Sequence, residues 1–419
     1  MKLKTKIGII SLGIIVLVII AVGIYWVVGK KTTLSVMVGD KTIFTKETKK
    51  DLPKKLEPKL VWQKEFDSEI LDFVIPRMPE IRKPDEFPIV AIDTEKELLF
   101  FDKKGNIAGR IPIEGRRITL PSENGEYLFM SVIKEREYVE FPWDVNSWKY
   151  LVYTGEELWR INDVYGWPID ISPEGDVIIV CKPDNGIWFY DKNGKVIRSY
   201  NDIRYECGSA LSSFSADGKY YVFSFVFHKS DEECEYGLIL FEKNGKILWK
   251  QNFNDSINEL HISHHGEVIF IECGWKDKYK SPYFYLFDKK GTLLWQRSYD
   301  CPQDIILSPK GDILVIENKG FSFSLIDTLS SKEFNLLEFR GANSVCVTSI
   351  SPDSTFLSIV KKKVDGIYKM YIISKEGEII FKKNYNEDAG DVTIEFSSDN
   401  SCFIIVKEIK RILVYKLTF

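Results

Sequence analysis

The sequence holds few side chains suited to chemistry, and its four histidines are the first to consider. His261, His264 and His265 lie within five residues of chain, and imidazoles grouped in this way are typical of zinc sites. However, no cysteine pair lies near them, and His264 and His265 occupy the positions that Pro309 and Lys310 hold in a repeated turn. We therefore interpret them as turn residues and predict no metal site.

Hydrolytic chemistry is also poorly supported. A serine nucleophile on a strand-to-helix turn would carry the pattern Gly-x-Ser-x-Gly, which this chain lacks. A catalytic triad needs a base as well, most often a histidine, and histidines are scarce here. We predict no catalytic residue, so a binding function is favoured over an enzymatic one.

Acidic and amide residues recur where one repeated unit passes into the next, mostly after an aromatic residue. They are Asp67, Asp163, Asp202, Asp255, Asp300 and Asn386. Such residues usually hydrogen-bond to their own backbone in turns. Because all of them would lie on one face, the alternative is a rim that binds cations, sugars or a basic partner. Ca²⁺ is the one cofactor that such a rim would hold, and no other is predicted.

The cysteines suggest a second repeated feature. The seven are Cys181, Cys207, Cys234, Cys273, Cys301, Cys346 and Cys402. The first two are spaced almost as Cys273 and Cys301 are two units later, which favours two disulfides, Cys181–Cys207 and Cys273–Cys301, each worth ~3 kcal/mol. Two alternatives stay open: Cys207 pairs with Cys234, or all seven are reduced thiols that pack as small hydrophobes.

All of these residues are positioned by a repeat of about 45 residues that runs from Lys59 to Phe419. Each unit has four short apolar runs. The first run ends in a turn such as Ser308-Pro309-Lys310-Gly311, and the third in one such as Asp288-Lys289-Lys290-Gly291. Proline presets φ and glycine accepts positive φ in tight turns. This period and composition predict an all-β fold, a β-propeller with one blade per unit.

The two ends of the repeat region explain the number of blades. The last unit has only three apolar runs, whereas residues 59–66 look like a fourth run with no unit before it. We expect strand 59–66 to pair with strand 411–417 and close the ring over residues 59–419, because closure removes two exposed sheet edges. Eight blades follow; seven is the alternative, if the first or second unit is a decoration.

Three units share a glycine and a tryptophan at fixed spacing: Gly155-x-x-x-Trp159, Gly245-x-x-x-Trp249 and Gly291-x-x-x-Trp295. The motif resembles the docking motif of the PQQ-like (pyrroloquinoline quinone) repeat superfamily, in which eight-bladed rings are common. The resemblance implies that these tryptophans, with Trp62 in the closing segment, pack across blade junctions. Arg198, Phe381 and Gly109 stand at the tryptophan position in other units.

The same resemblance bears on chemistry. Catalytic members of the superfamily hold quinone and Ca²⁺ with a Glu–Asn–Asp set, and many carry a vicinal Cys-Cys. This chain has no Cys-Cys, and no stretch matches the acidic set. The resemblance therefore implies a non-catalytic member that binds partners.

The N-terminus predicts a membrane anchor. Residues 7–29 include no charged residue, and a helix of that length spans roughly 34 Å, enough for a hydrocarbon core of ~30 Å. Three lysines precede it, and Tyr25 and Trp26 lie near its end, where interfacial aromatics are enriched. We predict a cytoplasmic tail at 1–6 and a propeller outside the cytoplasm. A cleaved signal peptide is the alternative, although the apolar run exceeds a usual signal core.

Residues 30–58 predict a lysine-rich stalk, either a solvated tether or a basic cuff on anionic head groups. Its middle has the pattern of a small hairpin around Gly39 and Asp40.

The numbers of basic and acidic residues in the whole chain are nearly equal, 57 Lys+Arg against 61 Asp+Glu, which argues against nucleic-acid binding. We expect a membrane-anchored, non-enzymatic platform for another envelope protein. The alternative is a ligand or cation receptor, or a PQQ-like enzyme, that uses the acidic face.

Overall fold

In the computed structural model of the chain, the described residues are 34–38, 41–46, 57–67, 70–74, 90–94, 96–102, 104–112, 117–122, 124, 126–133, 145–162, 166–182, 186–201, 211–228, 234–274, 281–299, 302–318, 322–338, 344–362, 367–385, 391–396, 402–408 and 410–417. None of them belongs to a helix long and apolar enough to cross a membrane. The tail and helix expected over 1–29 lie outside these residues. The chain divides into two compact units, residues 1–55 and 56–419.

The described residues of the first unit form one antiparallel pair of strands. These are β1 (Leu34–Val38) and β2 (Lys41–Lys46), joined in register from Leu34↔Lys46 to Val38↔Lys41. This is the hairpin that the pattern around residues 39–40 predicts.

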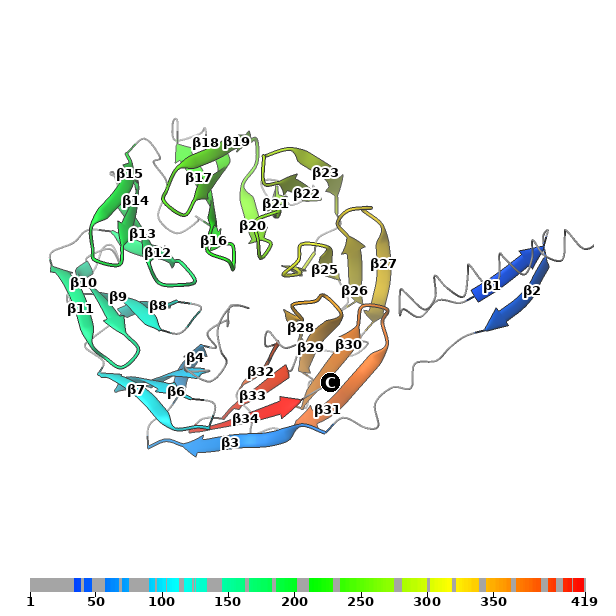
Figure 1. Ribbon diagram of the computed structural model, residues 1–419, viewed down its shortest axis with the longest axis horizontal. Helices are drawn as coiled ribbons and strands as arrows, with labels where there is room; N and C mark the ends of the chain where they lie inside the picture. The colour runs from blue at the N-terminus through cyan, green and yellow to red at the C-terminus, as the bar shows by residue number, and fades with distance from the viewer. Residues whose placement is uncertain are drawn as a thin grey trace, which may run out of the picture. The chain divides into compact units, whose positions relative to one another are not determined.

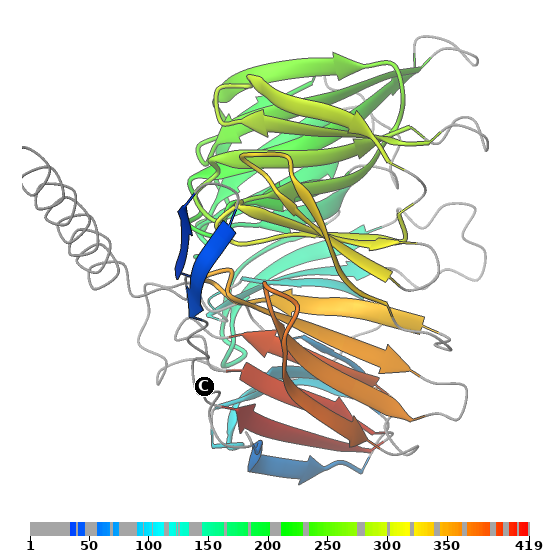
Figure 2. The ribbon, with the colours of Figure 1, turned by 90° about the vertical axis from the view of Figure 1, so that its right-hand side faces the viewer.

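The second unit is an eight-bladed β-propeller. In the described part of this unit, the strands form eight antiparallel four-stranded sheets, and Figure 1 shows them arranged around a central axis. The predicted all-β fold with eight blades is confirmed, and the alternative of seven blades is wrong. Figure 2 shows the same sheets side-on.

The strands of the first four blades run in chain order. Blade 1 is β4 (Ile70–Val74), β5 (Val90–Thr94), β6 (Glu97–Phe101) and β7 (Ile107–Pro112); blade 2 is β8 (Arg117–Pro121), β9 (Tyr127–Ile133), β10 (Val145–Val152) and β11 (Glu157–Asn162); blade 3 is β12 (Trp167–Ile171), β13 (Val177–Lys182), β14 (Gly186–Asp191) and β15 (Val196–Tyr200); blade 4 is β16 (Ser212–Phe214), β17 (Tyr220–His228), β18 (Cys234–Glu242) and β19 (Ile247–Phe253).

The other four blades complete the ring. Blade 5 is β20 (Ile257–Ile262), β21 (Val268–Cys273), β22 (Tyr283–Asp288) and β23 (Leu293–Ser298); blade 6 is β24 (Asp304–Leu307), β25 (Ile313–Asn318), β26 (Ser322–Asp327) and β27 (Glu333–Glu338); blade 7 is β28 (Ser344–Ile350), β29 (Phe356–Lys362), β30 (Tyr368–Ser374) and β31 (Ile379–Tyr385); blade 8 is β32 (Asp391–Phe396), β33 (Cys402–Lys407), β34 (Arg411–Leu417) and β3 (Lys59–Glu65).

Blade 8 joins the two ends of the propeller. The outer strand β3 pairs antiparallel with β34, from Lys59↔Lys416 to Glu65↔Arg411, and Figure 1 shows the blue strand beside the red ones. This is the pairing that the incomplete last unit predicts. It gives the sheet its fourth strand, so the ring closes by backbone hydrogen bonds between residues more than 340 positions apart.

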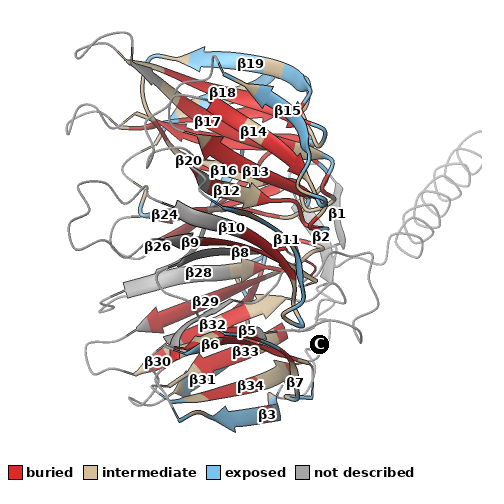
Figure 3. Cartoon of the chain, turned by 90° about the vertical axis from the view of Figure 1, so that its left-hand side faces the viewer, coloured by how far each residue is buried: buried red, intermediate tan, exposed pale blue. Residues whose placement is uncertain are grey.

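The core lies between neighbouring blades. Middle strands such as β13 and β21 are buried almost throughout because both sheet faces pack against other blades. Outer strands such as β15 and β19 are mostly exposed, as Figure 3 shows in pale blue. Each interface has its own hydrophobic cluster, which accounts for apolar runs that do not alternate strictly with polar residues.

Antiparallel order gives the propeller two different faces. We call the junction face the one that carries the links from each fourth strand to the next first strand, such as residues 254–256. We call the turn face the opposite one, which carries the turns after first and third strands, such as 308–312 and 288–292. Each innermost strand therefore begins at the junction face and ends at the turn face.

Serine anchors the turns that follow the first strands. In blade 6 the buried Ser308 hydroxyl donates to Asp312 Oδ1 at 2.8 Å and accepts from the backbone N–H of Ile313 at 3.0 Å. Gly311 closes the turn at φ +75°, where a non-glycine residue would be strained. Related serine contacts recur in blades 2, 3, 4, 5 and 7.

Tryptophans of four outer strands contact the next blade. The indole N–H of Trp159 donates to the Lys192 carbonyl at 2.8 Å, that of Trp249 to Lys289 at 3.1 Å, and that of Trp295 to Thr328 at 2.8 Å. Trp62 stacks on Phe101 of blade 1 at 5.4 Å between ring centroids, but its buried N–H has no hydrogen-bond partner among the described residues. All four expected docking residues thus lie at blade junctions.

Gly109 holds the tryptophan position in blade 1 for a steric reason. A Cβ there would clash with the Tyr153 carbonyl of blade 2. The backbone of the next blade fills the space that an indole fills at other junctions.

Candidate functional site

The junction face carries the predicted rim only in part within the described residues. Asp67 and Asp255 are described, and both lie on links between blades. Asp67 is exposed, and its backbone carbonyl accepts a hydrogen bond from Lys410 Nζ at 3.4 Å. The other four candidates, Asp163, Asp202, Asp300 and Asn386, lie outside the described residues, so their grouping stays a prediction.

Four carboxyl groups that the sequence analysis did not single out lie on the inner strands of blades 5 and 6. Glu259 of β20 is the register partner of Glu272 in β21, and Asp304 of β24 is that of Glu317 in β25. First strands begin and second strands end at the junction face, so both pairs lie toward it. We call Glu259, Glu272, Asp304 and Glu317 the inner acidic group.

Two members of the inner acidic group are almost fully buried: Glu272 is 5% exposed and Glu317 is 3% exposed. Burial, together with the charge of Glu259, raises the pKa of Glu272 to about 7. Burial and the charge of Asp304 raise the pKa of Glu317 to about 7. Burial also raises the pKa of Asp304. Near neutral pH the carboxyls of Glu272 and Glu317 are therefore only partly ionised.

The polar groups of this region are incompletely satisfied. In the described part of the chain, the Glu317 carboxyl makes no hydrogen bond and no ion pair. The buried Nε2 of His261 also lacks a hydrogen-bond partner among the described residues, and it lies 3.7 Å from Glu259 Oε2. A buried acceptor without a donor is costly, so the inner acidic group is suited to receive a positively charged donor.

The histidine-rich turn lies elsewhere. His264 and His265 are in the turn between β20 and β21, on the turn face, where His265 Nδ1 is 3.3 Å from Asp217 Oδ2. His261 lies within β20. Over the described ranges, no three His, Cys, Asp or Glu side chains are placed to hold a metal ion.

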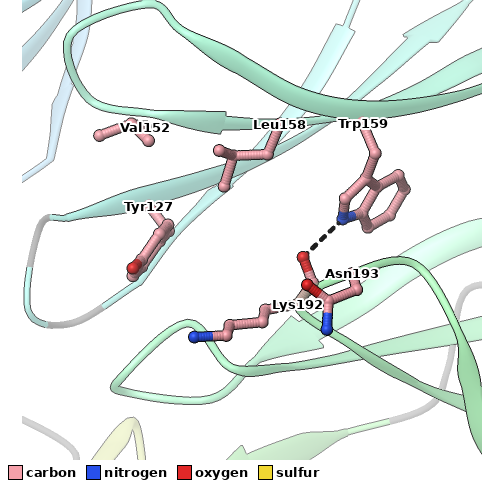
Figure 4. A pocket seen from close by; sticks show the side chains of 6 residues that line it. All are labelled: Tyr127, Val152, Leu158, Trp159, Lys192 and Asn193. Atoms are coloured by element: carbon pink, nitrogen blue, oxygen red, sulfur yellow. Dashed lines mark hydrogen bonds between the residues drawn. The ribbon is translucent and has the colours of Figure 1, made fainter.

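Three clefts open between adjacent blades in the described part of the propeller. One of about 390 Å³ lies between blades 2 and 3; Figure 4 shows Leu158 and Trp159 on one side of it and Lys192 and Asn193 on the other, bridged by the indole hydrogen bond. A second, of about 710 Å³, follows between blades 3 and 4. A third, of about 480 Å³, lies between blades 4 and 5 and includes Asp255.

The cysteines that can be described are not bridged to one another. Cys273 is a buried free thiol within the hydrophobic cluster between blades 4 and 5, so no Cys273–Cys301 bridge is present. Its side chain packs as a small hydrophobe instead. Cys207 and Cys301 lie outside the described residues. The pairing of Cys181 with Cys207, and its alternative of Cys207 with Cys234, remain predictions.

Comparison with known proteins supports the fold. No family model matches the sequence, and no curated protein sequence matches it either. Similar solved structures include Sqt1 from Saccharomyces cerevisiae, with TM-score 0.55 and 12% identity over 86% of this chain and 99% of that one. The C-terminal WD40 domain of Sif2 has TM-score 0.55 and 11% identity over 87% and 100%. BamB from Moraxella catarrhalis has TM-score 0.48 and 12% identity over 86% and 100%. At these identities the likeness to Sqt1 and to the Sif2 domain shows the β-propeller fold alone, and the resemblance to the PQQ-like superfamily stays a prediction.

Proposed function

We propose that this protein is a non-enzymatic platform of the cell envelope that binds a partner protein through its junction face. It would be held at the membrane by the helix predicted over 7–29, with the propeller outside the cytoplasm. The β-propeller is a fold commonly used to bind proteins. The observation that carries the proposal is the inner acidic group, which combines buried carboxyls with raised pKa values and no cationic partner at Glu272 or Glu317 among the described residues.

The chemistry of the group favours a basic side chain of a partner over a metal ion. Metal ligands must converge on one point, and no described trio of acidic, histidine or cysteine side chains does so. A lysine or arginine carries its charge on a long stem and needs only one or two carboxylates. Truncating either member of such a buried pair is costly, which gives specificity.

The chain enters the propeller on the face opposite the inner acidic group. The strand β3 starts at its Lys59 end, beside the end of β34, which is the turn face. Residues 57 and 58 therefore lead into the propeller on that side.

The proposal is tested by site-specific photo-crosslinking of the full-length protein in its native membrane. A crosslinker at Asp255 reports on the junction face, and one at Asn193 on the turn face. We expect the crosslinker at position 255, but not the one at position 193, to capture a single partner protein, with about one partner molecule for each crosslinked propeller. Adding Glu259→Lys should lower its yield at least about tenfold, whereas Lys192→Glu, a charge reversal on the turn face, should not. Capture from position 193 alone, or a yield unaffected by Glu259→Lys, would contradict the proposal.

A defined probe tests the chemistry separately. Fluorescein-labelled nona-arginine should bind the propeller more tightly at pH 8 than at pH 6, because Glu272 and Glu317 ionise near pH 7. The variant Glu272→Gln with Glu317→Gln should bind with at least about tenfold lower affinity and lose this pH dependence. Equal binding of nona-arginine by the variant and the unchanged protein would show that the inner acidic group is not the site.

A further inference from the structure

The cleft of about 480 Å³ between blades 4 and 5 has a lining unlike that of the inner acidic group. Blade 4 contributes Gln251 and Phe253 from β19, and Asp255 from the link that follows. Blade 5 contributes Tyr283 and Tyr285 from β22 and Gln296 from β23. Its size falls within the range of small-molecule sites.

Aromatic rings from both blades line this cleft. Tyr283 is 43% exposed, and its ring centroid lies 6.4 Å from that of Tyr285. Phe253 meets Tyr285 edge-on at 5.4 Å, and Tyr285 stacks on the buried Phe287 at 6.2 Å with 9° between the planes. The inner rings are thus held in place, while the Tyr283 side chain is exposed to solvent.

Neutral hydrogen-bonding groups stand beside these rings. Gln296 Nε2 donates to the Tyr285 hydroxyl at 3.3 Å, which leaves the amide oxygen of Gln296 as an acceptor. The exposed Gln251 amide makes no hydrogen bond within the described residues. Asp255 adds one carboxylate at the junction-face end. Burial and the nearby charge of Asp255 raise the pKa of Tyr285, so its hydroxyl is protonated at neutral pH.

This combination matches the chemistry of a sugar ring. The C–H face of a pyranose packs on an aromatic ring, as apolar groups do, and each hydroxyl both donates and accepts hydrogen bonds. Side-chain amides offer both functions, and a carboxylate accepts from hydroxyl pairs. A cationic ligand would be expected to face more than one carboxylate, and an apolar ligand would leave the amides without partners.

We propose that the cleft between blades 4 and 5 binds a neutral saccharide. The sugar ring packs on Tyr283, its hydroxyls bond to the amides of Gln251 and Gln296, and Asp255 accepts from a further hydroxyl at the junction-face end. The site goes beyond the partner-binding role and does not depend on it, since none of its side chains belongs to the inner acidic group.

Saturation-transfer NMR on the purified chain, followed by calorimetry, tests the proposal. The probes are glucose, galactose, mannose, N-acetylglucosamine and cellobiose, with arginine as the cationic comparison. We expect transfer to at least one saccharide and a loss of affinity of at least about tenfold in Tyr283→Ala and in Gln296→Ala. Phe334→Ala, which removes an aromatic side chain 54% exposed on the outer strand of blade 6, should bind as the unchanged protein does.

Asp255→Asn distinguishes a sugar site from a cation site. An asparagine still accepts from a hydroxyl, so saccharide affinity should fall by less than about threefold, whereas a cation would lose its only counter-charge. Absence of saturation transfer to all five saccharides would overturn the proposal. So would undiminished binding in Tyr283→Ala, or binding of arginine that Asp255→Asn abolishes. None of these outcomes affects the crosslinking test of the junction face.

Discussion

The hydroxyl of Tyr200 donates a hydrogen bond of 2.7 Å to the carbonyl oxygen of Gly245, across the junction between blades 3 and 4. At three other junctions a tryptophan N–H bonds to the same turn of the next blade. Here Arg198 stands at the tryptophan position, and its Cβ lies against Gly245. A residue two positions further along β15 therefore supplies the polar contact that the indole supplies elsewhere.

Removing this hydroxyl should destabilise the propeller by a modest amount. Tyr200→Phe leaves the ring packed against Phe241, 5.7 Å between centroids, but leaves the Gly245 carbonyl without its donor. We expect the free energy of unfolding to fall by ~1 kcal/mol, measured by urea denaturation. Tyr220→Phe is the control, because the Tyr220 hydroxyl makes no hydrogen bond within the described residues. Equal losses in both variants would show that the Tyr200 contact has no special role.

The sequence predicts the propeller well because each unit repeats its own turn chemistry. Ser308, Pro309 and Gly311 mark the turn after the first strand, and similar residues mark it in most units. The segment around Trp62 predicts the closing strand, since a fourth apolar run without a preceding unit must pair elsewhere. Local patterns of this kind need no knowledge of how blades contact each other.

The inner acidic group and the cleft between blades 4 and 5 are harder to predict from the sequence, because both depend on contacts between strands or blades. Glu272 and Glu317 appear in sequence as polar residues near the ends of apolar runs, which is also how ordinary strand ends appear. Their burial follows only when the neighbouring blade covers them. Cys273 is the reverse case. Its spacing in the sequence suggested a disulfide, but its side chain lies in a hydrophobic cluster that the spacing does not reveal.

The inner acidic group should make stability depend on pH. In the folded protein Glu272 and Glu317 have pKa values raised from 4.5 to about 7, so the native state binds more protons than the unfolded state between these values. The free energy of unfolding contributed by these groups therefore falls as pH rises from about 4.5 to about 7. Glu272→Gln and Glu317→Gln should each stabilise the protein by roughly 1–2 kcal/mol at pH 8 after solvent screening.

The same variants should have little effect near pH 5, where the two carboxyls are already protonated. Thermal unfolding at both pH values measures the difference. Glu235→Gln, a substitution in blade 4 outside the inner acidic group, serves as the control. Stabilisation of equal size at both pH values would contradict the raised pKa values, because it would reflect packing and not charge.

The buried thiols should be unreactive in the native protein. Burial raises the pKa of Cys273 and of Cys402 well above the usual range, and the thiolate is the reactive form. We expect iodoacetamide at pH 8 to label neither residue natively and to label both in urea, as read by peptide mass analysis. Native labelling of Cys273 at the rate seen in urea would contradict its placement. Mass analysis of non-reduced digests of the unlabelled protein would show whether Cys181 and Cys207 are joined by a disulfide.

Ring closure should make the two ends of the propeller necessary for the whole. Deleting residues 411–419 removes β34, which lies between β33 and β3, so blade 8 loses its third strand and β3 loses its partner. We expect the entire propeller to lose its cooperative thermal transition, because loss of β34 would also uncover the hydrophobic cluster that blade 8 shares with blade 1.

A point substitution at the same junction should have a smaller effect. Trp62→Ala, which removes a side chain 7% exposed at that junction, should lower the free energy of unfolding by about 3–5 kcal/mol without abolishing folding. Leu329→Ala is the control, since Leu329 is 84% exposed in a turn and should cost under about 0.5 kcal/mol. An unchanged melting temperature after the deletion would mean that closure by β3 contributes nothing to stability.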